Sequence, residues 1–325
     1  MRMGILLLHE TLKTIQDSIP PGGGPPGAAA GRPPGPPPGF SFQEAFFQLV
    51  QFVGWFLSVG AVGFRFGIVR RVRGMSDEAR TILRPDVAAR LGMLGILLLL
   101  IGILGGPFLS SIAEHKTFLE ALPKNRAPLE FKLAMLVLAL IGFAIVGAAR
   151  TLGWTLAAIG IVFAVLQPLY TGKGAGKVNA VHILAASTWL GTLLVLSLVG
   201  IRGVIRSATA GRQRAELVAD LVNSFSPLAL SAAAIVALTG LTTAWMHLKH
   251  VSALWTTSYG AALIVKLILV LIVVVLGAWN WQRVRPSLGS EGSEETIRRS
   301  STMELTFAGL VLLATSVLVT LPSPR

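Results

Sequence analysis

The sequence predicts an all-α fold, a polytopic membrane helix bundle of about eight transmembrane helices. Of its 325 residues 53% are hydrophobic, and the mean hydropathy is +0.70, which together do not fit a soluble protein. The chain also contains a series of apolar runs, each near the roughly 20 residues that a helix needs to cross about 30 Å of hydrocarbon. Because these runs do not alternate apolar with polar residues, helices are expected and barrel strands are not.

Two N-terminal segments are expected to lie outside the membrane domain. Residues 1–19 place apolar side chains at steps of three and four, which predicts an amphipathic helix at an interface or on a partner, with a frayed tail as the alternative. Residues 20–41 are rich in Pro and Gly, so neither regular helix nor sheet can form and a linker is expected. Residues 42–325 then form the eight-helix membrane domain.

Eight apolar segments divide the membrane domain. Helix-start patterns support two of them: Ser226-Pro227 fits an N-cap followed by proline at the first helical position, and residues 301–304, "STME", fit a capping box. The predicted spans are 46–68, 91–113, 129–149, 152–169, 178–201, 226–247, 255–279 and 303–321.

The distribution of basic residues predicts the orientation. The connections after the first, third, fifth and seventh helices hold fifteen basic residues, all arginine. Under the positive-inside rule these connections face the cytoplasm, so both termini lie outside. The net charge of +13 does not indicate nucleic-acid binding, because the basic residues form no patch with interleaved aromatics. All five histidines then fall on or near the outer side: His9, His115, His182, His247 and His250.

The composition also restricts the chemistry. The chain has no cysteine, which excludes disulfides and thiolate metal sites and leaves histidine, methionine and oxygen as candidate ligands. It has no phosphate-binding loop of the Gly-x-x-x-x-Gly-Lys-Ser/Thr type, so ATP-driven work is not expected. The pattern indicates a protein that is not an enzyme.

The stretch "VHILAASTWLG", residues 181–191, contains the first candidate ligand. His182 lies near the outer end of the fifth helix and shares a face with Trp189. A polar group at that depth needs a partner. His182 is either a metal ligand or a histidine that is hydrogen-bonded to a neighbouring helix carbonyl.

The stretch "AWMHLKH" contains the other candidates, Met246, His247 and His250. The two histidines share a helix face if the sixth helix continues past Trp245, and imidazoles with a thioether suit copper. Two ligands do not close a site, so a third would have to come from His182, His115 or Met246. An interfacial polar rim is the alternative, and bis-histidine haem ligation would need His182 to face one of these histidines.

Two basic side chains fall inside predicted spans. Lys266 lies near the middle of the seventh span without an obvious carboxylate partner, which makes it a functional candidate. It must contact carbonyls, reach a polar cavity or lose its charge. Arg65, near the inner end of the first span, is expected to extend its side chain to the interface.

The order of several short motifs resembles that of the CopD family of copper-resistance membrane proteins. The resemblance covers residues 178–322. Its motifs are "VHILAASTWLG" (181–191), "FSPLAL" (225–230), "TGL" (239–241), "YG" (259–260) followed by Lys266, "LGAWN" (276–280), Pro286, the pair Arg298-Arg299 and a closing "LP".

The resemblance implies an inner-membrane protein that moves copper between periplasm and cytoplasm, often beside a small periplasmic copper-binding protein. It carries over His182, Trp189 and Lys266. In two places the chain departs from the family: Gly172-Lys173 replaces the usual Gly-His, and Gly191-Thr192 the usual Gly-Gly. Two functions are therefore expected. The first is copper transport or tolerance through outer histidines, and the alternative is a CopD-like scaffold without metal handling in a larger membrane complex, docked by residues 1–39.

Overall fold

The protein is a bundle of long helices. The computed structural model describes residues 41–70, 83, 85–206, 211–248, 250–279, 282 and 293–322. The predicted N-terminal helix and the linker up to residue 40 lie outside these residues. Every regular element in the described part is a helix, and eight of these helices are long and apolar enough to cross a membrane. The predicted all-α polytopic bundle is confirmed.

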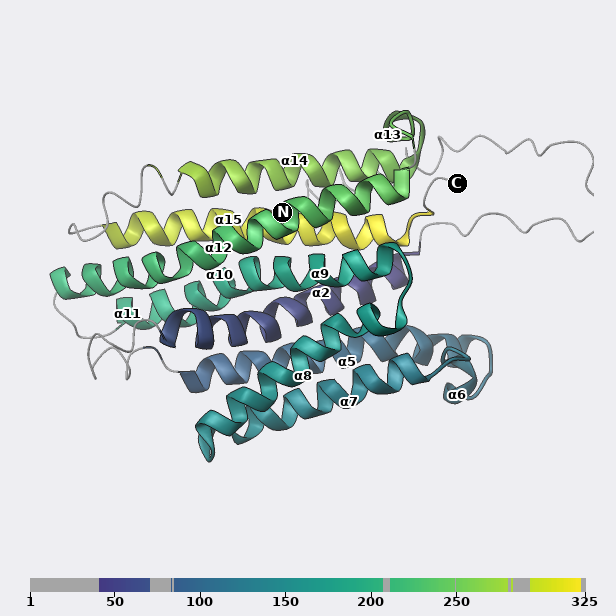
Figure 1. Ribbon diagram of the computed structural model, residues 1–325, viewed down its shortest axis with the longest axis horizontal. Coiled ribbons are helices and arrows are strands. Elements are labelled where there is room, and N and C mark those ends of the chain that lie inside the picture. Colours follow the sequence, from purple (N-terminus) through teal and green to yellow (C-terminus); the bar gives the residue numbers. More distant parts are fainter. Residues whose placement is uncertain are drawn as a thin grey trace, which may run out of the picture.

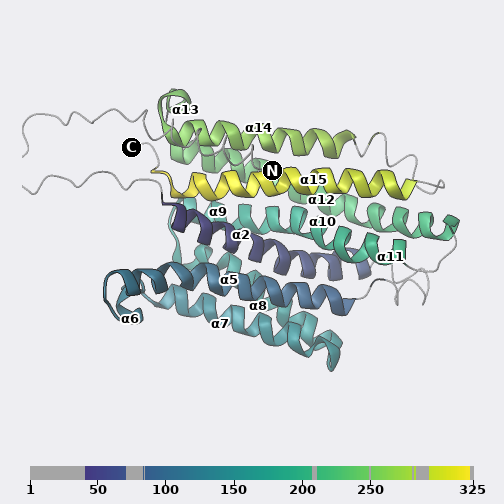
Figure 2. The ribbon, with the colours of Figure 1, turned by 180° about the vertical axis from the view of Figure 1, so that it is seen from behind.

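The helices follow one another in an up-and-down order (Figures 1 and 2). In chain order they are α2 (Phe42–Gly63), η1 (Phe64–Val69), α5 (Pro85–Ala113), α6 (Phe118–Ala121), α7 (Ala127–Ala144), η2 (Ile145–Gly147), α8 (Arg150–Thr171), α9 (Ala175–Ala186), η3 (Ser187–Gly191), α10 (Thr192–Val195), η4 (Leu196–Ile201), α11 (Arg202–Arg206), α12 (Gly211–Leu248), α13 (Ala253–Thr256), α14 (Ser258–Trp279) and α15 (Ser293–Thr320).

Helix α2 lies in the middle of the bundle. On one side it packs against α5, and α7 and α8 pair beyond it. On the other side it contacts α10, η3 and α15, while α12 and α14 complete that side (Figure 1). The central position of α2 explains why its apolar residues extend around the helix instead of forming one stripe.

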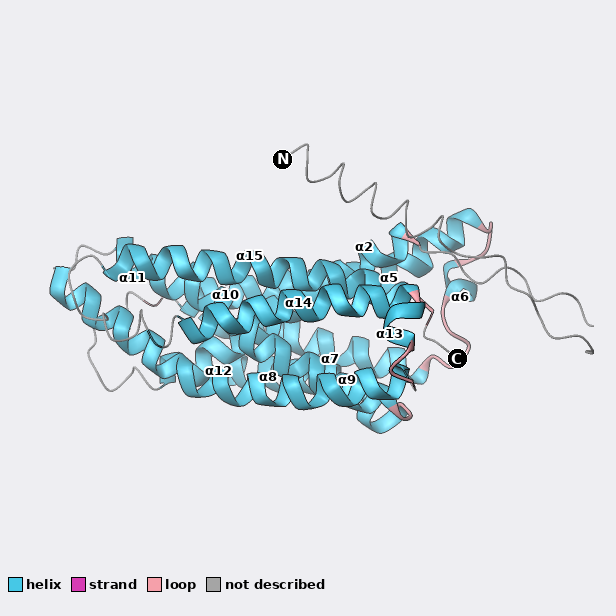
Figure 3. Ribbon diagram, turned by 90° about the horizontal axis from the view of Figure 1, so that it is seen from above, coloured by secondary structure: helices cyan, strands magenta, loops and turns pink. Residues whose placement is uncertain are grey.

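The two ends of the bundle differ in their side chains. One end carries α6, α13 and the start of α9 (Figures 1 and 3). The histidines of the described part lie at or near it, so we call it the histidine end: His115, His182, His247 and His250. The other end carries α11 and the first turns of α12, with arginines such as Arg70, Arg150, Arg202 and Arg206. The histidines of the described part thus lie toward one end and most of its arginines at the other, although Arg126 is at the histidine end, where it donates to the carbonyl of Leu119.

Glycines allow α2 to approach its neighbours closely. A Cβ atom on Gly60 would overlap the backbone of Gly191, and one on Gly191 would overlap the carbonyl of Phe56. A Cβ atom on Gly54 would lie 2.7 Å from the carbonyl oxygen of Gly95 in α5. Small residues at helix crossings bring backbones together in this way in membrane proteins.

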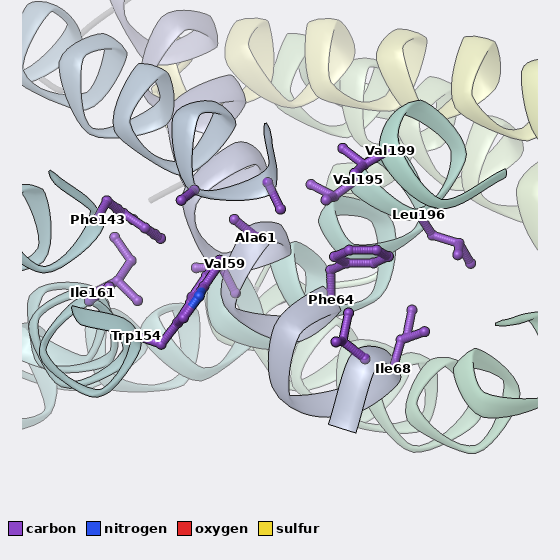
Figure 4. Packing of buried hydrophobic residues seen from close by; sticks show 14 of the residues in the cluster. Val59, Ala61, Phe64, Ile68, Phe143, Trp154, Ile161, Val195, Leu196 and Val199 are labelled. Carbon is purple, nitrogen blue, oxygen red and sulfur yellow. The ribbon is translucent and has the colours of Figure 1, made fainter. Parts of the chain in front are cut away.

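Large side chains fill the space around these crossings. Phe143 of α7 and Trp154 of α8 meet edge to face, with ring centroids 5.7 Å apart (Figure 4). Phe64 of η1 is fully buried and lies near Leu196 of η4 (Figure 4). This main core joins α2, α5, α7, α8 and the helices of the fifth span.

Two predicted helix starts are wrong. Helix α12 begins at Gly211, so Pro227 lies inside it, and the Ser226 hydroxyl donates to the carbonyl of Val222 at 2.8 Å instead of capping a new helix. Helix α15 begins at Ser293, so residues 301–304 are also internal. Both helices begin well before the apolar segment that was predicted to span the membrane. The residues that resemble caps therefore lie inside the helices and do not mark their starts.

The fifth span is irregular. It runs from Ala175 to Arg206 and contains two π-helical segments, η3 and η4; a third, η1, follows α2 beside them. A π-helical turn inserts one extra residue into an α-helix and is often found at functional sites. The irregular turns therefore mark the contact between α2 and the fifth span.

Candidate functional site

The imidazole of His182 lies against α12. His182 is in α9, about two turns after Ala175, and its side chain is partly buried. Its Nδ1 atom lies 3.0 Å from Oγ1 of Thr239. A Cβ atom on the adjacent Gly240 would come within 3.2 Å of the ring atom Cε1. A hydrogen bond and the absence of a side chain together fix the ring between α9 and α12.

Lys266 lies near this imidazole. It is on α14, roughly 12 Å along the helix from Ser258, and its side chain is partly buried. Lys266 is the charged group near enough to His182 to influence it electrostatically, without a hydrogen bond between the two among the described contacts.

Met246 follows the same face of α12 toward the histidine end. It lies seven residues, or two turns, after Thr239, which separates the two along the helix by roughly 10 Å. Its Cε atom would lie 3.7 Å from a Cβ atom on Gly174, in the turn before α9. Met246 therefore lies over the entrance to α9, one step farther out than His182, and its side chain is 40% exposed.

His247 and His250 do not share a helix face, so that prediction is wrong. Helix α12 ends at Leu248, and His250 follows it in an exposed bend. His247 stacks on the ring of Tyr259 in α14, with centroids 6.0 Å apart, and its Nδ1 atom lies 2.8 Å from the carbonyl oxygen of Thr243. The ring of His247 thus faces α14, whereas Met246 faces α9.

The four predicted ligands therefore do not form one closed set. No group of three or more His, Cys, Asp or Glu side chains that could hold a metal ion occurs in the part of the chain that the structure describes. Shared haem ligation would require His182 to face His247. Instead, His182 faces Thr239, and His247 stacks on Tyr259. A copper site formed by His182, Met246, His247 and His250 stays a prediction.

Trp189 has a packing role in the structure. It lies in η3 and contacts both the main core and a second cluster that includes Phe56, Leu190 and Val273. It connects the fifth span to α2 and to α14. Its position two turns below His182 makes it part of the support of the site.

Sequence reasoning missed several polar groups beneath the histidine. The hydroxyl oxygens of Ser187, Thr192 and Ser197 are buried and have no hydrogen-bond partner among the described residues. All three lie in or directly after the π-helical segments. The only sign of these hydroxyls in the sequence is their spacing of five residues. In an α-helix with 3.6 residues per turn, residues five apart do not share a face, so this spacing did not mark them as a group.

Arg65 also differs from its prediction. Its side chain does not extend to the interface, because the residue is 7% exposed and its Cζ atom lies 6.0 Å from the ring centroid of Phe66. It is part of η1, at the contact with α12. The guanidinium is therefore held inside the bundle.

The comparison with known families concerns the second half of the chain. Residues 219–318 match the family described as CopD, copper resistance protein D. Over these residues the predicted resemblance is confirmed. The matched segment contains Thr239, Gly240 and Lys266, whereas His182 lies before it.

One curated relative supports the same resemblance. The chain is 30% identical over 144 residues to the "Copper transport protein CutJ" of Bacillus subtilis (strain 168). The aligned part covers 44% of this chain and 24% of the relative, so the similarity spans about a quarter of that protein's length. No solved structure matches the chain.

Proposed function

We propose that this protein is a membrane protein of copper transport or tolerance, which takes copper from the periplasmic side of a bacterial inner membrane without ATP hydrolysis. The observation that carries the proposal is the hydrogen bond between His182 and Thr239, two residues 57 positions apart. Through it, two motifs of the resemblance meet at an imidazole, a group that binds copper. Thr239 lies in the segment that matches copper resistance protein D, and the curated relative is named a copper transport protein.

The charges at the two ends support the expected orientation in the membrane. The arginine-bearing end is expected in the cytoplasm under the positive-inside rule, so the histidine end faces the periplasm. Met246 lies at the entrance to α9, where its thioether suits Cu(I), and His182 lies about two turns deeper. Copper would therefore meet the thioether first and the imidazole second. A small periplasmic copper-binding protein is the expected donor.

Metal analysis of the purified protein tests the proposal. The natural chain is loaded with Cu(I) or Cu(II), washed, and compared with His182→Ala and with the double variant His247→Ala/His250→Ala. We expect about one retained copper per chain that is lost in His182→Ala. His115→Ala is the matched control, because His115 is exposed in the loop before α6. Equal and negligible copper in all variants would contradict the proposal.

A second function, without metal binding, is favoured because the predicted copper ligands do not converge on one point. His182, Met246 and His247 point to different neighbours, and Lys173 occupies the place of the family's usual histidine. A CopD-like scaffold that handles no metal would have both properties. In that case residues 1–39 dock on another subunit of a larger membrane complex.

Purification from the native membrane in mild detergent separates the two functions. A stoichiometric partner that is lost when residues 1–39 are deleted, together with unchanged copper tolerance in the deleted strain, would favour the scaffold. Retained copper in the purified protein and copper sensitivity on loss of His182 would favour transport.

A further inference from the structure

The hydrogen bonds of Thr239 determine which nitrogen of His182 carries the proton. The Thr239 hydroxyl oxygen lies 2.6 Å from the carbonyl oxygen of Ile235. Two oxygens at this distance require a hydrogen between them, and a carbonyl can only accept. The one hydroxyl hydrogen of Thr239 is therefore donated to Ile235.

Toward the imidazole, Thr239 can then only accept. Its Oγ1 atom lies 3.0 Å from Nδ1 of His182, so the hydrogen of this bond belongs to Nδ1. The carbonyl oxygen of Val236 is a second acceptor beside the ring, 3.3 Å from the same Thr239 hydroxyl. Two acceptors on one edge of the ring favour a proton on Nδ1.

A neutral imidazole with its proton on Nδ1 has its lone pair on Nε2. Metal-binding histidines commonly donate their other ring N–H to an oxygen acceptor, which fixes the tautomer and the direction of the ligand lone pair. The contact between His182 and Thr239 has this arrangement before any metal is bound.

Gly240 fixes the position of the ring. With a Cβ atom at residue 240, the distances to Cε1 and Nδ1 of His182 would be 3.2 and 3.6 Å. The first distance is tighter than ordinary van der Waals contact, so the ring would have to move away by a few tenths of an ångström. Such a shift lengthens the bond between Nδ1 and Thr239.

We infer that Thr239 and Gly240 are positioning residues, which hold His182 with Nδ1 protonated and present Nε2 as the ligand for a transition-metal cation. The identity of that cation as copper rests on the proposed function. The hydrogen-bond arrangement does not, because it follows from contacts within the protein.

Nitrogen NMR of the metal-free protein tests the arrangement directly. The protein is labelled with ¹⁵N-histidine, and the signals of His182 are identified by their loss in His182→Gln. We expect the protonated nitrogen to be Nδ1 in the natural chain and in Thr239→Ser, which keeps the hydroxyl. In Thr239→Val, which keeps the shape and loses the acceptor, we expect a mixture of both tautomers. A proton on Nε2 in the natural chain would overturn the inference, whether or not copper binds.

Copper affinity provides the second readout. Loss of an outer hydrogen-bond partner of a metal ligand costs roughly 10- to 100-fold in affinity. We expect Thr239→Val to weaken Cu(I) binding by that factor and Thr239→Ser to restore it. In the His182→Gln background Thr239→Val should have no further effect, because the residue acts through the imidazole. An equal loss in both backgrounds would overturn the inference.

Matched controls separate positioning from folding. Thr242 donates to Leu238 as Thr239 does to Ile235, but it is exposed, so Thr242→Val should leave copper affinity unchanged. Gly240→Ala should weaken copper binding, whereas Gly277→Ala on α14 should not, because a Cβ atom there meets nothing within 4 Å. If the natural chain binds no copper but shows the Nδ1 proton, the proposed function fails and the positioning of His182 stands.

Discussion

The two halves of the bundle differ in how deeply they are packed. In the most apolar stretch of 18 residues in α2 with η1, 72% of the residues are buried inside the protein, and in that of the fifth span 56% are buried. In α5, α8 and α7 the shares are 39%, 44% and 28%, and in α12, α14 and α15 they are 22%, 11% and 17%. The main core lies mostly in the packed half and takes in only the first half of α12, with Val218, Leu221 and Phe225. The rest of the open half belongs to two small clusters around residues such as Val273 and Leu263.

The two halves also contribute different residues to the candidate site. The open half contains nearly all of the segment that matches copper resistance protein D, residues 219–318. The fifth span, in the packed half, holds His182, and the open half supplies Thr239 and Lys266 around it. The candidate site thus lies at the joint between the packed half and a part whose apolar faces suit lipid.

The largest effect is expected where two backbones touch within the packed half. Gly191→Ala places a Cβ atom against the carbonyl of Phe56, and a backbone cannot move aside as a flexible side chain can. We expect a loss in unfolding free energy of about 3 kcal/mol or more, at or beyond the upper end for overpacking. Denaturation in mixed micelles followed by tryptophan fluorescence measures it.

Gly309→Ala in the open half is the control for this substitution. A Cβ atom at residue 309 meets nothing within 4 Å, so the variant should be as stable as the natural protein or up to about 1 kcal/mol more stable. Equal losses in both variants would contradict the difference between the halves.

The second prediction concerns Thr192, at a position where the resemblance leads us to expect glycine. A Cβ atom on Gly63 would overlap the Thr192 hydroxyl, so Gly63→Ala should cost about 2 kcal/mol of stability. Thr192→Gly in the same protein removes the overlapping side chain and should restore most of that loss. A double-mutant cycle on unfolding free energies measures the coupling, and simple additivity of the two changes would refute it.

The third prediction tests the joint itself. Because the charge of Lys266 acts on His182, it opposes a copper cation bound there. Lys266→Met should therefore tighten copper binding by roughly tenfold, about 1.4 kcal/mol. Competition with a chromophoric Cu(I) chelator measures the change. Lys132→Met on α7 is the control in the packed half, and an unchanged or weaker affinity in Lys266→Met would count against the placement of its charge.

The smallest effect is expected in the short helix α6, at the edge of the packed half. Hydrogen bonds from the backbone N–H and the hydroxyl of Thr117 hold the pKa of Glu120 below its usual value. A carboxylate with a lowered pKa stabilises the folded turn above its unfolded pKa of about 4.3, and this contribution is lost as the pH falls through the lowered pKa. Hydrogen exchange of the Thr117 amide, corrected for its intrinsic pH dependence, should lose protection in that acidic range.

Glu120→Gln should weaken that protection at neutral pH and abolish its dependence on acid. Glu114→Gln is the control, because the carboxylate of Glu114 pairs with Lys116 and does not cap α6. A pH dependence that survives in Glu120→Gln would assign it to another group.

The spans could be predicted from the sequence because a helix that crosses the hydrocarbon needs an apolar run of roughly 20 residues, and such runs are visible in the sequence. The starts of α12 and α15 could not, because both helices continue past the membrane-length segment and their internal Ser, Pro and Glu residues resemble caps. His182 could be singled out from its depth. Its partner Thr239 could not, because helical periodicity says which residues share a face and not which face meets another helix.

The error at His250 has a similar origin. A three-residue spacing places two side chains on one face only while the helix lasts, and α12 ends at Leu248. Arg65 was expected at the interface because it is near the end of a span, but η1 and its neighbours bury it. The end of α12 was not predictable in the first case, and the direction in which Arg65 points around its helix was not predictable in the second.

The π-helical turn η3 sets the rotational phase between two halves of one span. His182 must face α12 while Gly191 must face α2, and an extra residue in η3 between them determines the angle between these directions. If η3 were regular α-helix of unchanged length, the extra residue would rotate His182 relative to Gly191 by up to about 100°, the turn that one residue makes in an α-helix. The crossing of α2 with the fifth span would remain. The imidazole of His182 would lose its hydrogen bond to Thr239, although the residues next to His182 in the sequence would be unchanged.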